Sequence, residues 1–571
     1  MKPSFLTAIT CLATTLFAQD FERVAPKEPK EFDPQRGKVY GPSGRFVELQ
    51  DGDQIVVPEL KGVLLLKEQT PVSSEDLQRA VGGVDILNVQ VPGKLKSLNT
   101  LISEKFLGKP LTKQGILELK SEIILYYRRW GRPVVTLEIP QQKITEGVLQ
   151  VIVIEGKLGK VTVEGNNYFK EETLKDFIRL EEGSAIDSNV LLTDIDWINR
   201  NPFRQVDVIY SPGEIAGTTD IRLLTLDRCP WRVYAGVDNT GYDETDNTRL
   251  FAGVNWGNVF GLDHILSLQF TCAPHVDRFW AVTGHYTIPL PWRDTWVFYG
   301  GYSQVHPKMP NPSLRNTGYA AQASTRYNFI MKPLPGYLHD LNVGADYKRT
   351  NNDIEFGGDE VFRQSVNLTQ LVAGYNGAYA SEWVKASLTF ELFYSPGTWL
   401  PDQSNADYEQ VRYKGNAHYL YGRFACAPII RLPRDFAFAL TLRGQVATHN
   451  LIASEQFGLG GYNTVRGYKE RAVNVDDAFL ASAELRSPSL SFIGQRVFKD
   501  MMQFLIFLDY GIGRNVQREP EEKRSEYLLG FGPGVRYDIN PYINFRGDLG
   551  IQLHKLDSRG FRFHFGLVAS Y

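Results

Sequence analysis

The sequence is poor in cysteine, has no excess of either charge, and contains only one long apolar run. Its four cysteines are far apart and form no CxxC pair, and they stand at Cys11, Cys229, Cys272 and Cys426. This spacing predicts neither a disulfide framework nor a zinc site. Lysine and arginine number 62 against 65 aspartates and glutamates, so the formal net charge is −3 and gives no electrostatic reason to expect a nucleic-acid partner.

The apolar run occupies residues 5–17, after a single lysine, and is followed by Ala18. This layout predicts a secretory signal peptide at residues 1–18, with an N-terminal core helix as the alternative. The run is too short to span a membrane, and no uncharged apolar run of about 18 residues follows it. If the exported chain sits in a membrane, it must do so as a barrel.

Residues 19–57 are rich in proline, glycine and charged side chains, which predicts a linker rather than a packed element. The prolines at positions 26, 29, 34 and 42 argue against an amphipathic helix in this stretch.

Two small α/β modules are predicted to follow, at residues 58–156 and 157–228. In each, apolar residues at helical spacing precede two apolar strands. In the first module Thr112 is a good N-cap for a helix, because its hydroxyl can accept a hydrogen bond from the first helical turn. The same order of elements then repeats, which indicates tandem modules, each with one open strand edge.

From residue 229 to residue 571 the helical period gives way to a period of two. Ala386, Leu388 and Phe390 share one face of a predicted strand, whereas Ser387 and Thr389 share the other. Sixteen such segments follow residue 230, one of them at 411–424. The predicted fold is therefore a pair of α+β modules followed by an all-β transmembrane barrel of sixteen antiparallel strands. A soluble two-sheet sandwich would show the same alternation and is the alternative.

The longest predicted loop of the barrel, residues 449–477, contains the tetrapeptide Val465, Arg466, Gly467 and Tyr468. The thirteenth predicted strand contains FLDYG, which places Asp509 among apolar neighbours. An unpaired charge inside a barrel is costly, so we hypothesise a charge-assisted pair between Arg466 and Asp509.

With these motifs the chain resembles the two-partner secretion transporters, the TpsB or ShlB/FhaC/HecB group of the BamA-like outer-membrane superfamily. The likeness covers residues 60–571. The further segments that carry it are YYRRWGRPVVTLEIP (126–140), NRNPFRQVDVIYSP (199–212) and CPWRVYAGVDNTG (229–241). The resemblance implies two periplasmic POTRA domains, at 58–156 and 157–228, and a sixteen-stranded barrel at 229–571.

The same resemblance implies roles for the loop and the wall. The VRGY tip, Val465 to Tyr468, is expected to fold back into the pore and to engage the barrel wall at Asp509 and Gly511. Family members often carry an N-terminal plug helix in the pore, and the prolines of residues 19–57 argue against such a helix here. No cofactor and no metal are implied.

The function that the resemblance implies is translocation across the outer membrane of a diderm bacterium. The POTRA domains would lie in the periplasm and recognise an unfolded exported passenger, a TpsA-like protein, which then passes through the barrel to the cell surface. Other expected partners are outer-membrane lipid and, for the insertion of the barrel itself, periplasmic chaperones and the barrel assembly machinery.

Three alternatives remain. A BamA-like assembly factor belongs to the same superfamily but carries more modules, and a passive porin leaves the tandem modules unexplained. An enzyme is not predicted, because the sequence contains no GxSxG, HExxH or P-loop motif. Three histidines on the polar faces of predicted strands, His285, His418 and His564, are expected to line the lumen.

Overall fold

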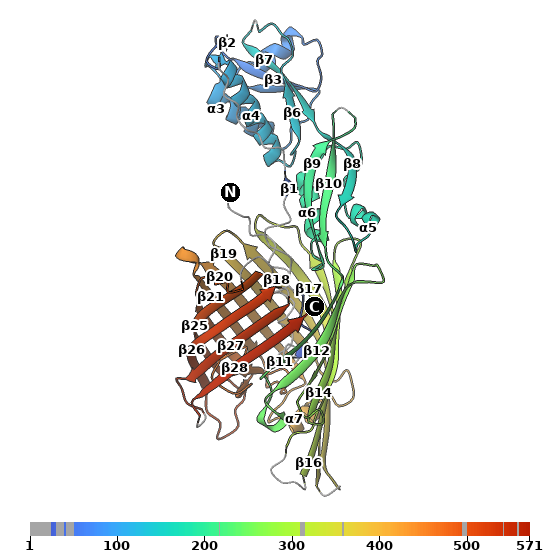
Figure 1. Ribbon diagram of the computed structural model, residues 1–571, viewed down its shortest axis with the longest axis vertical. Helices are drawn as coiled ribbons and strands as arrows, with labels where there is room; N and C mark the ends of the chain where they lie inside the picture. The colour runs from blue at the N-terminus through green and yellow to red at the C-terminus, as the bar shows by residue number, and fades with distance from the viewer. Residues whose placement is uncertain are drawn as a thin grey trace. The chain divides into compact units, whose positions relative to one another are not determined.

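The computed structural model describes residues 24–29, 39–40, 51–144, 146–215, 217–308, 314–356, 359–493, 499–540, 542–556 and 559–571. The predicted signal peptide lies outside these residues. The chain divides into two compact units, one formed by residues 36–200 with 204–228, and the other by residues 1–35 and 201–203 with 229–571. Figure 1 shows the elements of both units, which are described in turn.

The first module is a four-stranded sheet covered by helices. The strand order is β4-β3-β7-β6, and a short pair, β2 with β5, lies beside it. The strands are β2 (Ile55–Val57), β3 (Gly62–Leu66), β4 (Val84–Leu87), β5 (Leu111–Thr112), β6 (Val135–Glu138) and β7 (Val148–Glu155). The helices are α2 (Ser74–Ala80), α3 (Leu95–Phe106) and α4 (Lys113–Arg129).

Helix α4 forms where the sequence predicts it. The Thr112 hydroxyl accepts a hydrogen bond from the Gly115 amide at 3.0 Å, which satisfies one of the free amides of the first turn. Leu119, Ile123 and Tyr127 recur at helical spacing and are buried in the core of this module. Burial of this apolar stripe, rather than propensity alone, holds the helix on the sheet.

The second module repeats the plan with the strand order β1-β9-β10-β8. Its elements are β1 (Val39–Tyr40), β8 (Lys157–Glu164), α5 (Glu171–Asp176), α6 (Ser188–Ile198), β9 (Arg204–Pro212) and β10 (Thr218–Asp227). Strand β1 comes from the segment that the sequence analysis interprets as a linker, and it pairs parallel to β9 through Val39↔Val208 and Tyr40↔Ile209.

The linker interpretation of residues 19–57 therefore needs a correction. Strand β1 extends the second sheet, and strand β2 pairs with β5 in the first module. A third stretch, residues 24–29, is hydrogen-bonded to the barrel, as described below. Although the segment is rich in proline and charge, its backbone groups can bond to strands and to inward-facing side chains.

The second unit is a closed barrel of sixteen strands, as the sequence predicts. Neighbouring strands are antiparallel, and β11 pairs with β28 to close the ring, which excludes the two-sheet sandwich. The strands are β11 (Trp231–Asp238), β12 (Arg249–Val259), β13 (His264–Cys272), β14 (Phe279–Pro289), β15 (Thr295–Val305), β16 (Leu314–Ile330), β17 (Tyr337–Phe356), β18 (Asp359–Ala380), β19 (Val384–Pro396), β20 (His418–Arg431), β21 (Ala437–Ala447), β24 (Asp477–Arg486), β25 (Lys499–Arg514), β26 (Glu526–Asn540), β27 (Ile543–Gln552) and β28 (Phe561–Ser570).

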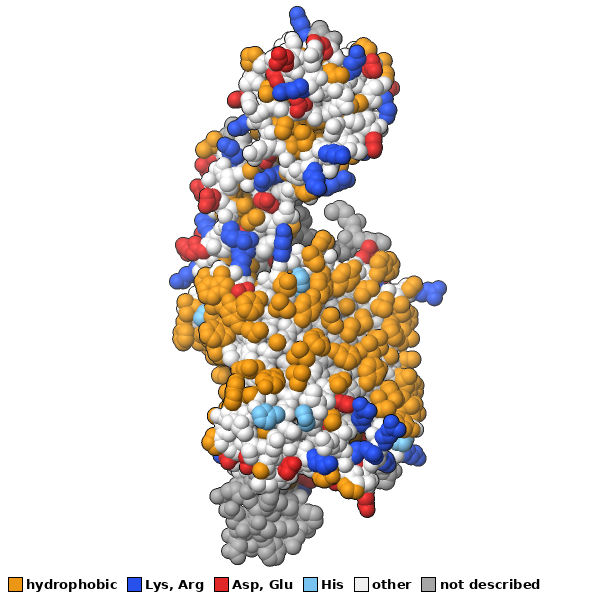
Figure 2. All heavy atoms as spheres, turned by 180° about the vertical axis from the view of Figure 1, so that it is seen from behind, with side chains coloured by type: hydrophobic (Ala, Val, Ile, Leu, Met, Phe, Trp, Pro, Cys, Tyr) orange, Lys and Arg blue, Asp and Glu red, His pale blue; other side chains and the backbone are white. Residues whose placement is uncertain are grey.

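The two faces of the barrel wall differ in polarity. On β25, Phe504, Ile506 and Leu508 point outward and are exposed, whereas Phe507 and Asp509 point inward and are buried. Figure 2 shows the outward apolar side chains as a broad band across the face of the barrel that is in view. Such a band suits the hydrocarbon of a bilayer. Among the described helices, none is both long enough and apolar enough to cross a membrane.

One predicted strand is misplaced. The segment predicted at 411–424 begins with the end of a helix, α7 (Asn405–Val411), and the strand β20 starts only at His418. Ser404 caps α7 with a capping box that the alternation pattern does not reveal. His418 lies on the same exposed face as Leu420, so the prediction that it lines the lumen is wrong, whereas His564 is buried on the inner face.

The outward position of Leu508 generates the first prediction. Leu508→Arg places a charge in the apolar band, which costs about 2–4 kcal/mol near the middle of a bilayer. We expect a smaller heat-modifiable fraction on electrophoresis and a lower free energy of unfolding in lipid bilayers. Leu508→Phe keeps the band apolar and is the matched control. A normal yield of folded Leu508→Arg barrel would contradict the outward assignment.

Candidate functional site

The loop between β21 and β24 folds back into the barrel. It contains a short hairpin of its own, in which β22 (Phe457–Leu459) pairs with β23 (Val473–Val475). Apolar residues of this hairpin and of the tip, among them Leu459 and Val465, are buried against Leu528 of the wall. The hairpin thereby presents the VRGY tip to the inner face of the last strands.

Arg466 at the tip is enclosed by the wall. Its Nε donates to Asp509 Oδ2 and its Nη2 to Asp509 Oδ1, both at 2.7 Å, and the Arg466 amide also donates to Oδ2 at 3.0 Å. Ser482 Oγ donates to Asp509 Oδ1 at 2.6 Å, and the guanidinium lies 3.5 Å from the centre of the Phe507 ring. The side chains of Arg466 and Asp509 are 3% and 0% exposed, so this bidentate pair is shielded from solvent.

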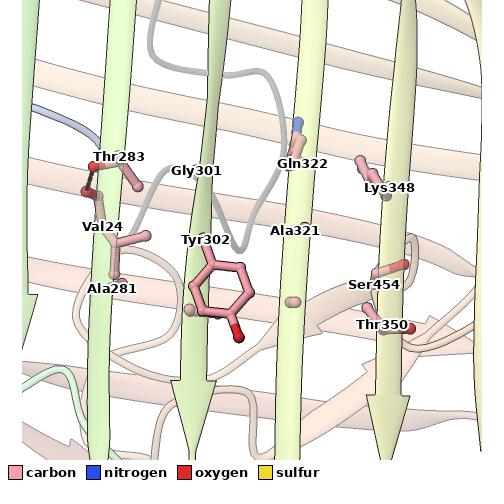
Figure 3. Close-up of a pocket in the computed structure, with 12 residues that line it drawn as sticks. Val24, Ala281, Thr283, Gly301, Tyr302, Ala321, Gln322, Lys348, Thr350 and Ser454 are labelled. Carbon is pink, nitrogen blue, oxygen red and sulfur yellow. Dashed lines mark hydrogen bonds between the residues drawn. The ribbon is translucent and has the colours of Figure 1, made fainter.

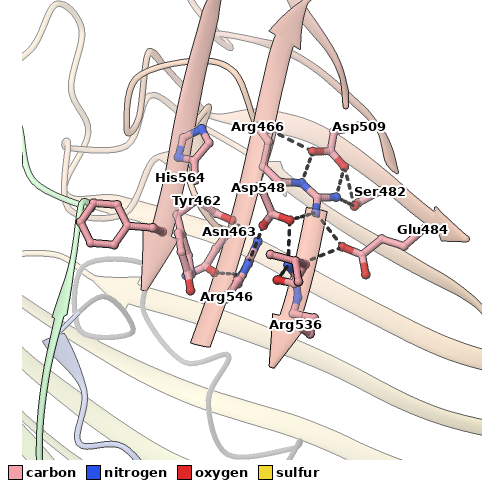
Figure 4. A network of polar contacts seen from close by, with 12 residues as sticks. Tyr462, Asn463, Arg466, Ser482, Glu484, Asp509, Arg536, Arg546, Asp548 and His564 are labelled. Carbon is pink, nitrogen blue, oxygen red and sulfur yellow. Dashed lines mark hydrogen bonds and ion pairs between the residues drawn. The ribbon is translucent and has the colours of Figure 1, made fainter. Parts of the chain in front are cut away.

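The pair belongs to a wider network of charges, shown in Figure 4. Arg466 Nη1 donates to Glu484 Oε1 at 2.7 Å. Arg536 and Arg546 both donate to the buried carboxylate of Asp548, each at 2.7 Å. Because every arginine in the network faces a carboxylate, the network satisfies the charges that the wall and the tip bring together.

Glycines make room for the tip at three positions on the wall. A Cβ at Gly550 would lie 2.2 Å from the Gly467 nitrogen, and one at Gly530 would lie 2.1 Å from the Arg466 oxygen. A Cβ at Gly511 would lie 2.9 Å from a methyl group of Val465. The tip therefore packs against backbone at positions where any residue other than glycine would place a Cβ in its way.

The rest of the tetrapeptide is also held by the wall. The Gly467 amide donates to His564 Nε2 at 3.0 Å, and Gln552 Nε2 donates to the Gly467 oxygen at 2.8 Å. The Tyr468 hydroxyl donates to the Leu529 oxygen and accepts from the Leu529 amide, both at 3.1 Å. Gly467 has a φ of +97°, a conformation that favours glycine.

The structure thus brings all six predicted site residues together. Val465 to Tyr468 lie on one loop, and Asp509 and Gly511 lie on β25, where they face the tip. Several of their partners could not be recognised from short motifs in the sequence: Ser482, Glu484, Gly530, Arg536, Arg546, Asp548, Gly550 and Gln552. These residues are polar side chains or glycines on the inward faces of the last strands. A search for short motifs misses them because it does not consider which face of a strand a residue occupies.

A second segment of the chain also contacts the inner wall. In residues 24–29 the Val24 oxygen accepts hydrogen bonds from Gln269 Nε2 at 3.0 Å and from Thr283 Oγ1 at 2.6 Å. The Lys27 amide donates to the Tyr234 hydroxyl at 2.8 Å. Val24 is helical and residues 26–29 have no regular secondary structure, and these hydrogen bonds hold the segment against the inner wall.

A cavity remains between these two segments. It is lined by Val24 of the N-terminal segment, Ser454 of the loop, and side chains of β14 to β17 that include Thr283 and Lys348. Figure 3 shows the hydrogen bond from Thr283 to Val24 at its edge. Several wall positions here carry small residues, among them Ala281 and Gly301. Among the described residues, no group of three or more His, Cys, Asp or Glu is placed to hold a metal ion.

Comparisons with known proteins agree with this architecture. Residues 217–537 match the family described as haemolysin secretion/activation protein ShlB/FhaC/HecB, and residues 156–225 match the POTRA family, described as surface antigen variable number repeat. The first of these matches covers more than half of the chain.

Individual relatives are distant in sequence but extensive in coverage. The chain is 22% identical to the heme/hemopexin transporter protein HuxB of Haemophilus influenzae, over 76% of this chain and 77% of that protein. It is 24% identical to the hemolysin transporter protein ShlB of Serratia marcescens, over 59% of each chain. The solved structure of CdiB from Escherichia coli superposes with a TM-score of 0.72 at 17% identity, covering 92% of each chain.

The glycine seat generates the second prediction. Gly550→Ala places a methyl group against the Gly467 backbone, so we expect the tip to leave its seat. Hydrogen exchange of the purified protein should show faster exchange at residues 463–470, where the amides of Arg466 and Gly467 now bond to the wall. Gly547→Ala on the same strand meets only the edges of flexible rings, at 3.2 Å or more, and is the control. Unchanged protection of the tip in Gly550→Ala would contradict this seating.

Proposed function

The chain belongs to the haemolysin secretion/activation family ShlB/FhaC/HecB, and from this membership we propose that a passenger protein crosses the outer membrane through the sixteen-stranded barrel to reach the cell surface. The observation that carries the proposal is the polar-lined barrel whose lumen is occupied by a loop tip held through Arg466. A transporter needs a passage that is closed at rest and can be opened, and a non-covalent seal of this kind provides one. The proposal contains no catalytic step.

In this proposal the loop tip acts as a seal. Arg466, Glu484 and Asp509 hold the tip by hydrogen bonds and ion pairs, which water and polar groups of a passing chain can replace. The N-terminal segment at residues 24–29 is held in the same way, mostly through its main chain. Withdrawal of the loop must also separate its apolar residues Leu459 and Val465 from Leu528 of the wall, whereas the contacts given for the N-terminal segment are mostly polar.

The two POTRA modules are proposed to receive the unfolded passenger. Each sheet ends in edge strands, β4 and β6 in the first module and β8 and β1 in the second. An extended chain can add to such an edge through main-chain hydrogen bonds, which depend little on side-chain sequence. This mode suits an unfolded passenger whose amino-acid sequence varies along its length.

The energy for export is proposed to come from the passenger itself. The sequence has no P-loop, so no nucleotide-binding motif supplies a motor. Folding of the emerging segment outside the cell would prevent its return and draw the chain forward.

The third prediction concerns secretion. Arg466→Ala and Asp509→Ala each leave a buried charge without its partner, so we expect either substitution to remove the seated resting state from which transport starts, and thereby to abolish secretion while the barrel still inserts and remains heat-modifiable. Arg514→Ala removes an exposed ion pair with Asp477 at the end of the same strand and is the control. Passenger in the medium and heat-modifiable barrel in the membrane are measured by immunoblotting. Normal secretion by both site variants would contradict the proposed role of the seated tip in transport.

The fourth prediction concerns the passenger. A photocrosslinking amino acid at Thr136, on the exposed face of edge strand β6, should capture one or a few exported polypeptides in growing cells. The same amino acid at Thr100, exposed on α3, should capture far less, because a helix offers no free edge. Capture of many outer-membrane proteins instead would indicate an assembly factor, and equal capture at both positions would contradict strand addition at β6.

A further inference from the structure

The stem of the loop is bound by a second set of buried charges. Glu455 lies between β21 and the loop hairpin, and its side chain is 0% exposed. Its Oε1 accepts from Lys348 Nζ at 2.7 Å, and its Oε2 accepts from the Tyr421 hydroxyl at 2.7 Å. The main-chain oxygen of Glu455 accepts from Arg423 at 3.0 Å and from Gln445 at 3.1 Å. These partners of one loop residue lie on three strands of the wall, β17, β20 and β21.

The wall leaves a buried cation for this carboxylate to neutralise. The neighbouring carboxylate on β17, Asp346, is bonded by both Nη atoms of Arg326, at 2.7 and 3.1 Å. Gln370 donates to Asp346 at 2.9 Å and to Glu455 at 3.3 Å, so it links the two carboxylates. The ammonium of Lys348 thus bonds to a carboxylate that the loop, and not the wall, provides. Withdrawal of the stem would leave that ammonium without Glu455.

The contacts of Glu455 and those of Arg466 share no strand. Glu455 binds residues of β17, β18, β20 and β21. Arg466 binds residues of β24 and β25. Each attachment has its own acceptors and donors, so the bonds at one can break while those at the other persist.

We propose that Glu455 is a positioning residue that forms a second, independent attachment and serves as the pivot of the loop. The inference rests on the proposed function: when the tip leaves β25, the stem stays on β17 to β21 and keeps the loop inside the barrel. Lys348, which bonds to Glu455, and Ser454, which precedes it in the chain, also line the cavity of Figure 3. The stem therefore borders the open part of the lumen, and the tip moves relative to it.

The test is hydrogen exchange with mass spectrometry on the purified full-length protein. In Arg466→Ala, residues 463–470 should exchange faster while residues 450–457 keep their wild-type protection. In Glu455→Gln, residues 450–457 should exchange about tenfold faster or more, because a buried charged hydrogen bond is lost, while residues 463–470 stay protected. The double variant should expose both stretches.

Controls separate positioning from general destabilisation. Glu409→Gln makes the same chemical change on the exposed surface of α7 and should alter neither stretch. Tyr421→Phe removes the hydrogen bond that Tyr421 donates to Glu455 and keeps the ion pair with Lys348. It should therefore give a smaller increase in the exchange rate of residues 450–457 than Glu455→Gln, and it replaces that variant if Glu455→Gln fails to fold. Strands β17 and β20 should keep their protection in every folded variant, which a merely structural role would not predict.

The proposal is overturned if Arg466→Ala alone exposes residues 450–457, because the loop then has one cooperative attachment. It is equally overturned if 450–457 stay protected in both Glu455→Gln and Tyr421→Phe. Exchange is measured without a passenger, so its outcome does not depend on the proposed function. Normal secretion by Arg466→Ala would contradict the transport role of the tip and leave the exchange pattern as a separate result.

Discussion

The guanidinium of Arg466 is buried inside the barrel, and a buried charge is stable only where its partners are in place. Asp509 and Glu484 supply the countercharges, and bare glycine backbone lets the tip come close enough to meet them. The position of the loop follows from this requirement. Residues far apart in sequence, on β24 to β28 and on the loop, are arranged around a single cation.

The lumen combines a firm resting state with easy release. Its two obstructions, the loop and the N-terminal segment at residues 24–29, are held by hydrogen bonds and ion pairs to the wall, and the loop also buries Leu459 and Val465 against Leu528. A polar contact is strong when it is buried and dry, but it has a small net free energy once water can replace it. The outward face is the opposite case, because its apolar band is held by the bilayer and does not change during transport. The passage can therefore open and close while the ring of sixteen strands stays intact.

Much of the architecture could be predicted from the sequence, and the limits have physical causes. The pleat of a strand sets the period of two in the barrel, so sixteen strands could be counted. The start of α4 could be predicted because Thr112 is a good N-cap. Helix α3 carries no such sign, since its N-cap Lys94 makes no side-chain cap bond. Helix α7 and the pairing of β1 depend on tertiary contacts. Motif and chemistry indicated Arg466 and Asp509, but Glu455 and Asp548 become visible only when strands are placed side by side.

The account depends on the tip leaving the wall during transport, and a reversible tether tests this most directly. The methyl group of Val465 lies 2.9 Å from the position of a Cβ at Gly511. In the double variant Val465→Cys with Gly511→Cys, an oxidised cross-link should hold the tip in place. The account predicts that oxidised cells secrete little or no passenger and that reduction restores secretion. Secretion at the wild-type rate with the cross-link intact would contradict it.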